Sequence, residues 1–148
     1  MREEHVTKAL LKWLIDSGWE IVCFDFPQSG TGKMLHPNGA SGDKNKKAII
    51  PDIVAVRSGV CVFFENKDRF YYPDYEKQNS LIVGNEYSVA IASLLAGYPV
   101  RMIYYGIGLP ESKHRRSSKE AAHLVDFILT VDDENGVKIA YNPADIKF

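Results

Sequence analysis

The strongest structural signal in the sequence lies in residues 49–67, IIPDIVAVRSGVCVFFENK. Two runs rich in β-branched and aromatic residues, 49–56 and 60–67, flank the segment Arg57-Ser58-Gly59. Because a short segment with serine and glycine suits a tight turn between paired strands, the stretch predicts an antiparallel hairpin.

Charged residues gather at the open end of this predicted hairpin. Asp52 lies six residues before Ser58, and Glu65 lies seven residues after it. Side chains alternate along a strand, so Glu65 and Lys67 face one side of the sheet and Asn66 faces the other. We therefore expect two carboxylates and one ammonium group to converge at this end.

Helical and extended patterns alternate in the rest of the chain, which predicts an α/β sandwich with a mixed sheet. Residues 74–96 read as two helical pieces broken near Gly84-Asn85, and the second piece, 88–96, is apolar nearly all round, which favours burial. Ser117 or Ser118 is expected to cap a short helix. We expect helices over 3–17, 74–96 and 118–124, and strands over 19–26, 99–105, 125–131 and 136–141, the last two forming a C-terminal hairpin over 125–141.

Length and composition limit the class of protein. The chain has 148 residues, of which 45% are hydrophobic and 25% charged, which is ordinary for one globular domain spanning 1–148. No apolar run approaches a membrane span, and no secretory signal is visible at the start of the sequence. Two cysteines, Cys23 and Cys61, do not form a disulfide scaffold or a zinc finger. These features predict a soluble cytoplasmic protein with no membrane partner.

The net charge of −1 argues against a nucleic-acid partner when it is taken alone. The charge is unevenly spread, however, because the long loop 27–48 carries a local balance of +3 and the segment 113–119 a balance of +4. Both segments suit phosphate contacts, although each could equally be a solubilising surface. The loop is also long for a connection inside one domain, and such loops are often functional or disordered.

The residues at the hairpin end suggest metal-dependent hydrolysis. Two close carboxylates such as Asp52 and Glu65 repel each other unless a proton or a cation neutralises them, and hard oxygen ligands suit Mg²⁺, with Mn²⁺ as a substitute. A neighbouring lysine, Lys67, can orient an attacking water. Glu3 falls near the apolar side of the first predicted helix, where an unpaired acid is costly. The alternatives are a surface ion-pair cluster and, for Glu3, an acid favoured by the helix dipole.

This combination of residues resembles the PD-(D/E)XK nuclease superfamily. The resemblance rests on Glu3, Pro51-Asp52 and Glu65-Asn66-Lys67 and covers about residues 3–105. It implies a restriction-endonuclease-like fold, a three-layer α/β/α sandwich with a central mixed sheet. It also implies that Asp52, Glu65 and the backbone carbonyl of Asn66 bind the metal, that Lys67 assists the water, and that Glu3 holds a second metal or a metal-bound water. Gln78, on the next helix, would face the site.

Two departures from the superfamily pattern bear on function. The residue at Asn66 is usually apolar, so the asparagine needs a partner in a helix-covered layer, or it marks a sheet edge or a subunit contact. The loop 27–48 is longer than the minimal core needs, and Ser29-Gly30 could match a Ser-Gly pair of Holliday-junction resolvases.

The sequence therefore predicts a Mg²⁺-dependent DNA endonuclease of restriction type. A Holliday-junction resolvase or a repair nuclease is one alternative, and a catalytically inactive DNA- or protein-binding module of the same fold, favoured by Asn66, is another. A homodimer is expected, since two strands are cut by two sites. Residues expected to contact DNA are Lys33, Lys44, Lys46, Lys47, Gln78, Arg115, Arg116 and Lys119.

Overall fold

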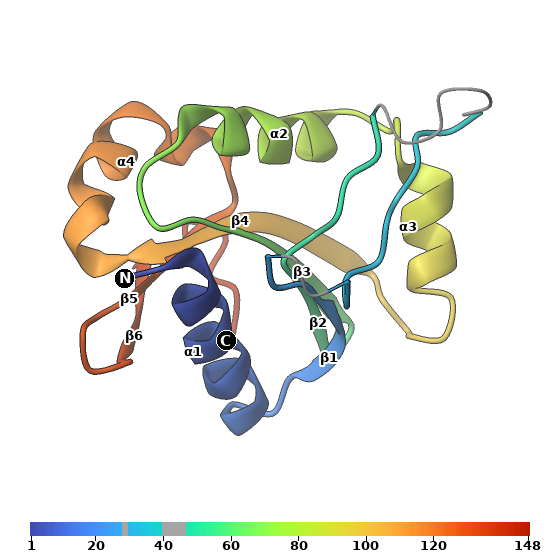
Figure 1. Cartoon of the computed structure of the whole chain (residues 1–148). Helices are drawn as coiled ribbons and strands as arrows, with labels where there is room; N and C mark the ends of the chain where they lie inside the picture. Colours follow the sequence, from blue (N-terminus) through green and yellow to red (C-terminus); the bar gives the residue numbers. More distant parts are fainter. Residues whose placement is uncertain (28–29, 40–46) are drawn as a thin grey trace.

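One mixed sheet organises the chain. The computed structural model describes residues 1–27, 30–39 and 47–148, and within these ranges six strands pair in the order β1-β2-β3-β4-β5-β6 (Figure 1). β3 pairs in parallel with β4, and β4 with β5, whereas the other neighbours are antiparallel. The strands are β1 (Glu20–Phe24), β2 (Ile53–Arg57), β3 (Val60–Asn66), β4 (Met102–Pro110), β5 (Phe127–Val131) and β6 (Val137–Tyr141).

Helices cover both faces of the sheet. Helix α1 (Glu3–Asp16) packs on one face, and α2 (Tyr72–Val83) and α3 (Ser88–Leu94) pack on the other (Figure 1). Along β2, Ile53 and Ala55 join the core under α1, while Val54 and Val56 join the core under α3. This alternation buries both faces of the central strands, and it confirms the predicted three-layer α/β/α sandwich with a mixed sheet.

The predicted central hairpin is present, with a later start. Ile53 pairs with Phe64 and Arg57 with Val60. The two turn residues between the strands, Ser58 and Gly59, have φ values of 51° and 81°, as the tight turns that match the twist of paired strands require. Strand β2 does not begin at residue 49, because Ile49 instead forms an isolated bridge with Leu35.

Strand β4 extends well beyond the predicted range of 99–105. Its extension contains Gly106 and Gly108, which sequence patterns associate with breaks. Here both glycines allow close packing: a Cβ at Gly106 would lie 2.4 Å from the Phe127 ring, and one at Gly108 would lie 2.3 Å from the Asn66 side-chain oxygen. The glycines therefore mark close approach of neighbouring groups rather than the end of the strand.

Two helix predictions need correction. The basic segment forms most of α4 (His114–Glu120), which lies between the 3₁₀ turns Glu111–Lys113 and Ala122–Leu124. Ser117 therefore lies inside the helix and does not cap it. Its side chain is buried and hydrogen-bonded to the Tyr75 hydroxyl. The predicted break after α2 is confirmed, but α3 is mostly exposed: Ile91 is its buried residue, and Val89 is 67% exposed. Its outer side borders a surface cleft shared with residues 33–39 of the long loop, instead of packing on the sheet.

The described part of the long loop is attached to the start of α3. The backbone N–H of Asn38 donates to the Glu86 carbonyl, and its side chain bonds Ser88 and the backbone of Asn85 and Val89. Ser29, Lys44 and Lys46 lie outside the described residues. The C-terminal hairpin is confirmed by the antiparallel pair β5 and β6. Among the described residues, no helix is both long enough and apolar enough to cross a bilayer.

Candidate active site at the end of the central hairpin

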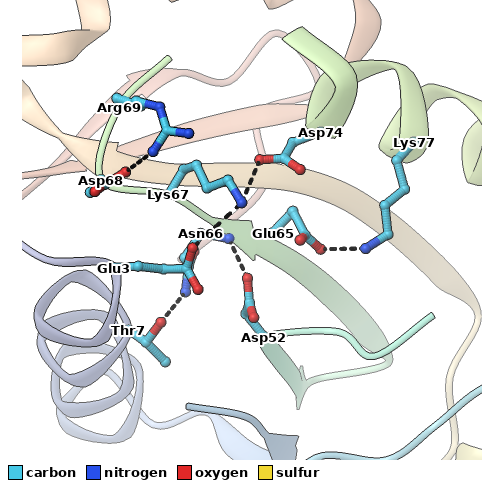
Figure 2. Close-up of polar contacts among 10 residues, drawn as sticks. All are labelled: Glu3, Thr7, Asp52, Glu65, Asn66, Lys67, Asp68, Arg69, Asp74 and Lys77. Atoms are coloured by element: carbon cyan, nitrogen blue, oxygen red, sulfur yellow. Dashed lines mark hydrogen bonds and ion pairs between the residues drawn. The ribbon is translucent and has the colours of Figure 1, made fainter. Parts of the chain in front are cut away.

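The open end of the hairpin brings Asp52 against the end of β3. The backbone N–H of Asp52 donates to the Phe64 carbonyl at 3.0 Å, which extends the pairing of β2 with β3 by one residue. The Asp52 carboxylate then accepts a hydrogen bond of 2.6 Å from the backbone N–H of Asn66 (Figure 2). The predicted convergence of this acid with the 65–67 segment is therefore present.

Glu65 faces α2, as the strand alternation predicts. One of its carboxylate oxygens lies 3.0 Å from the ammonium nitrogen of Lys77 (Figure 2). The Glu65 side chain is 12% exposed and that of Lys77 is 30% exposed. Sequence patterns gave no reason to select Lys77, because a helical lysine ten residues beyond a strand end resembles any surface lysine.

Lys67 lies between the two helical layers. Its ammonium nitrogen is 3.6 Å from a Glu3 oxygen on α1 and 3.9 Å from an Asp74 oxygen on α2, and it also lies 5.0 Å from the centre of the Tyr71 ring. Figure 2 shows the lysine reaching between these two acids. Asp74 is a site residue that the sequence analysis missed: in the first turn of a helix, after Pro73, it resembles an ordinary helix-start acid.

Asn66 points to the opposite side, into the layer under α1. It is 0% exposed, and its amide nitrogen donates to the Thr7 hydroxyl at 3.0 Å (Figure 2). Its side-chain oxygen is buried and accepts no hydrogen bond from the described residues, and it lies next to the space that Gly108 leaves open. The asparagine thus has a partner within its own chain, and its full burial rules out the subunit-contact alternative.

Burial and like charge favour the protonated forms of the carboxyl groups at the site. Burial, followed by the negative charge of Glu65, raises the pKa of Asp52 to about 8. Burial also raises the pKa of Glu65 and of Asp74, although Lys77 opposes the first shift and Lys67 the second. Burial lowers the pKa of Lys67, but nearby carboxylates, that of Asp74 first, outweigh it, so the pKa stands above its usual value and the ammonium stays charged.

These residues form what we call the charged cluster: Glu3, Asp52, Glu65, Lys67, Asp74 and Lys77. It contains four carboxyl groups and two ammonium groups, so its net charge is negative when all of them are ionised. Nowhere in residues 1–27, 30–39 and 47–148 do three His, Cys, Asp or Glu side chains meet closely enough to hold a metal ion. The donor set to consider is therefore Asp52, Glu65 and the Asn66 carbonyl, whose hard oxygens are the type that Mg²⁺ accepts.

Most of the described residues that were expected to contact DNA lie on the surface. Lys33, Lys47, Arg115, Arg116 and Lys119 are exposed. The last three line, with Arg69 and Phe70, a surface cleft of about 540 Å³, in which the Arg116 guanidinium lies 5.2 Å from the centre of the Phe70 ring.

Gln78 requires a correction. It is 2% exposed, and its amide donates to the backbone carbonyls of Phe63 and Gly106 at 3.2 and 2.8 Å. Instead of facing a nucleic acid, this side chain ties α2 to strands β3 and β4.

Neither the protein-family models, nor the curated proteins, nor the solved structures contain a match to this chain. The chemistry of the charged cluster therefore has to follow from its own geometry and charges.

Proposed function

We propose that the chain is a Mg²⁺-dependent DNA endonuclease of the PD-(D/E)XK type, which hydrolyses phosphodiester bonds. The observation that carries the proposal is the meeting of Asp52, Glu65 and Lys67 at one end of the central hairpin, with Glu3 beside Lys67 from the helix on the other face. Largely buried carboxylates with raised pKa values beside a charged lysine are typical of functional sites.

Each residue of the charged cluster has a role in this proposal. Asp52, Glu65 and the Asn66 carbonyl would hold the metal, which when bound polarises a phosphate oxygen and acidifies a water. Because the pKa of Lys67 is raised, its ammonium acts as a hydrogen-bond donor to the water or to the phosphate rather than as a base. Glu3 and Asp74 hold that ammonium in place from opposite layers.

DNA would be held by phosphate contacts outside the charged cluster. The exposed basic side chains of α4 and the cleft that they line offer a positive surface, and Lys33 and Lys47 offer another. Such contacts attract any DNA sequence and so position the duplex without reading it. Cutting both strands would need two copies of the site, which favours a homodimer. Cleavage of linear sites favours a restriction role, and cleavage of branched DNA favours a resolvase or repair role.

A catalytically inactive binding module is the second candidate. It is favoured by the ion pairs themselves, because Glu65 is already neutralised by Lys77, and Lys67 already contacts Glu3 and Asp74. A cluster that is satisfied in this way can be structural. The two candidates differ in whether the protein breaks the DNA that it binds.

Cleavage assays separate these candidates. Wild-type protein, Lys67→Ala and the control Lys12→Ala, whose lysine is exposed on α1, would be incubated with plasmid, linear duplex and four-way junction DNA, in Mg²⁺, in Mn²⁺ or in EDTA. We expect metal-dependent cleavage by the wild type and by Lys12→Ala. Loss of the Lys67 donor should slow cleavage by about 100- to 1,000-fold and leave DNA binding intact.

The remaining outcomes point elsewhere. Wild-type cleavage by Lys67→Ala would remove this lysine from the mechanism and with it the proposed assignment. DNA binding without cleavage of any substrate, in either metal, would establish the inactive module.

A further inference from the structure

Lys77 occupies the position where a cation would neutralise Glu65. It reaches from α2 over the same face of the sheet on which Asp52 and Glu65 lie, and its ammonium nitrogen contacts Glu65 at 3.0 Å (Figure 2). Its positive charge opposes the rise in the pKa of both carboxyl groups. Lys77 thus gives the two acids the electrostatic relief that a bound divalent ion would give them.

The two lysines of the charged cluster divide the acids between them. Lys67 contacts Glu3 and Asp74, and Lys77 contacts Glu65. The Glu65 side chain is largely buried, so water screens its charge poorly, and its ion pair with Lys77 is correspondingly important while no metal is bound.

An ammonium group and a divalent ion compete for one carboxylate. Each is attracted to the Glu65 carboxylate, and two positive charges brought close to it repel each other strongly where solvent screening is weak. Lys77 is able to leave, because its side chain is 30% exposed and an ammonium on a four-carbon stem moves readily.

We propose that Lys77 is an internal counter-ion that stabilises the metal-free site and must release Glu65 before a divalent metal binds. This inference rests on the proposed function, since it requires a metal at Asp52 and Glu65. It assigns to Lys77 a role in setting metal affinity, separate from the role of Lys67 toward the water or the phosphate.

Metal titration of charge-neutral variants tests the proposal. Mn²⁺ and Mg²⁺ would be titrated calorimetrically into the wild type, Lys77→Met, Lys77→Arg and the control Lys12→Met, and thermal unfolding would be followed in EDTA. Lys77→Met keeps the stem and removes the charge, so it should bind Mn²⁺ at least about tenfold more tightly and unfold at a lower temperature without metal. Lys77→Arg and Lys12→Met should bind as the wild type does.

The wild-type chain provides a second measurement that needs no variant. Reductive methylation of lysines, followed by mass spectrometry, would be compared in EDTA and in saturating Mn²⁺. Release from Glu65 should increase the methylation rate of Lys77 several-fold, while the rate at exposed Lys12 should not change.

Several outcomes would overturn the proposal. Equal or weaker Mn²⁺ binding by Lys77→Met, or no change in Lys77 methylation, would overturn the role of Lys77 while metal binding by the wild type still supported the proposed function. Absence of metal binding in the wild type and in Lys77→Met alike would overturn both.

Discussion

The two sides of strand β3 differ sharply at its end. Toward α1, Asn66 meets Thr7 in a neutral hydrogen bond, fully buried. Toward α2, one residue earlier, Glu65 is a largely buried acid whose pKa is raised. It is paired with Lys77 and lies close enough to Asp52 to raise the pKa of that acid as well. The α1 side is therefore neutral at this point, whereas the α2 side concentrates charged groups. Costly buried charges of this kind gather at functional sites.

The largest expected difference between the two sides of β3 is in how the unfolding free energy depends on pH, because the titrating group Asp52 belongs to the α2 side. The pKa of Asp52 is about 8 in the folded chain and near 3.8 in the unfolded one, so between these values the folded state holds a proton that the unfolded state has lost. Stability therefore falls as pH rises through this window, by at most about 1.4 kcal/mol per pH unit for this one group.

Asp52→Asn should remove most of this dependence, because the amide oxygen can still accept from Asn66 but carries no charge. Urea unfolding in EDTA at pH 5, 6.5 and 8 measures it, and the variant should be more stable than the wild type at pH 8. If both proteins show the same slope with pH, Asp52 is not the group that is held protonated.

A smaller change in unfolding free energy is expected for a substitution on the α1 side. Thr7→Val keeps the volume of the buried side chain but removes the acceptor for the Asn66 amide, which should cost about 1–3 kcal/mol of unfolding free energy. Metal affinity should not change, because the Thr7 side chain lies on the face away from Glu65.

The Asn66→Ala background supplies the control for Thr7. In that background the side-chain amide that needs an acceptor is absent, so adding Thr7→Val should lower the unfolding free energy only slightly. An equal cost in both backgrounds would show that the hydrogen bond is not what Thr7 contributes.

The smallest effect concerns Gln78, which shares α2 with Lys77 but is turned inward. Gln78→Met preserves bulk and removes the hydrogen bonds to Phe63 and Gly106, which should cost about 1 kcal/mol. The salt dependence of DNA binding should stay as in the wild type. A flatter salt dependence in Gln78→Met would instead return this residue to the DNA-contacting surface.

Local patterns predicted much of the site because two of its acids lie on one hairpin. Once the turn at Ser58 and Gly59 is recognised, pairing of neighbouring strands brings Asp52 to the Glu65 end with no knowledge of the rest of the fold. The orientation of Asn66 follows in the same way from strand alternation. The sequence pattern could not reveal Asp74 or Lys77, because helical charged residues look alike until the helix is docked.

Local sequence patterns account for the α/β class, the central hairpin and the convergence of Asp52 with the 65–67 segment, because these features depend on contacts between residues close in the chain. The side chains that contact these site residues follow only from how the helices dock on the sheet. Docking of α1 gave Asn66 its contact with Thr7, and docking of α2 placed Lys77 on Glu65 and Asp74 on Lys67. Tertiary structure also decided the extent of β4, whose glycines accommodate Phe127 and Asn66 from neighbouring strands. Those contacts join distant parts of the chain, and only packing, not local propensity, fixes them.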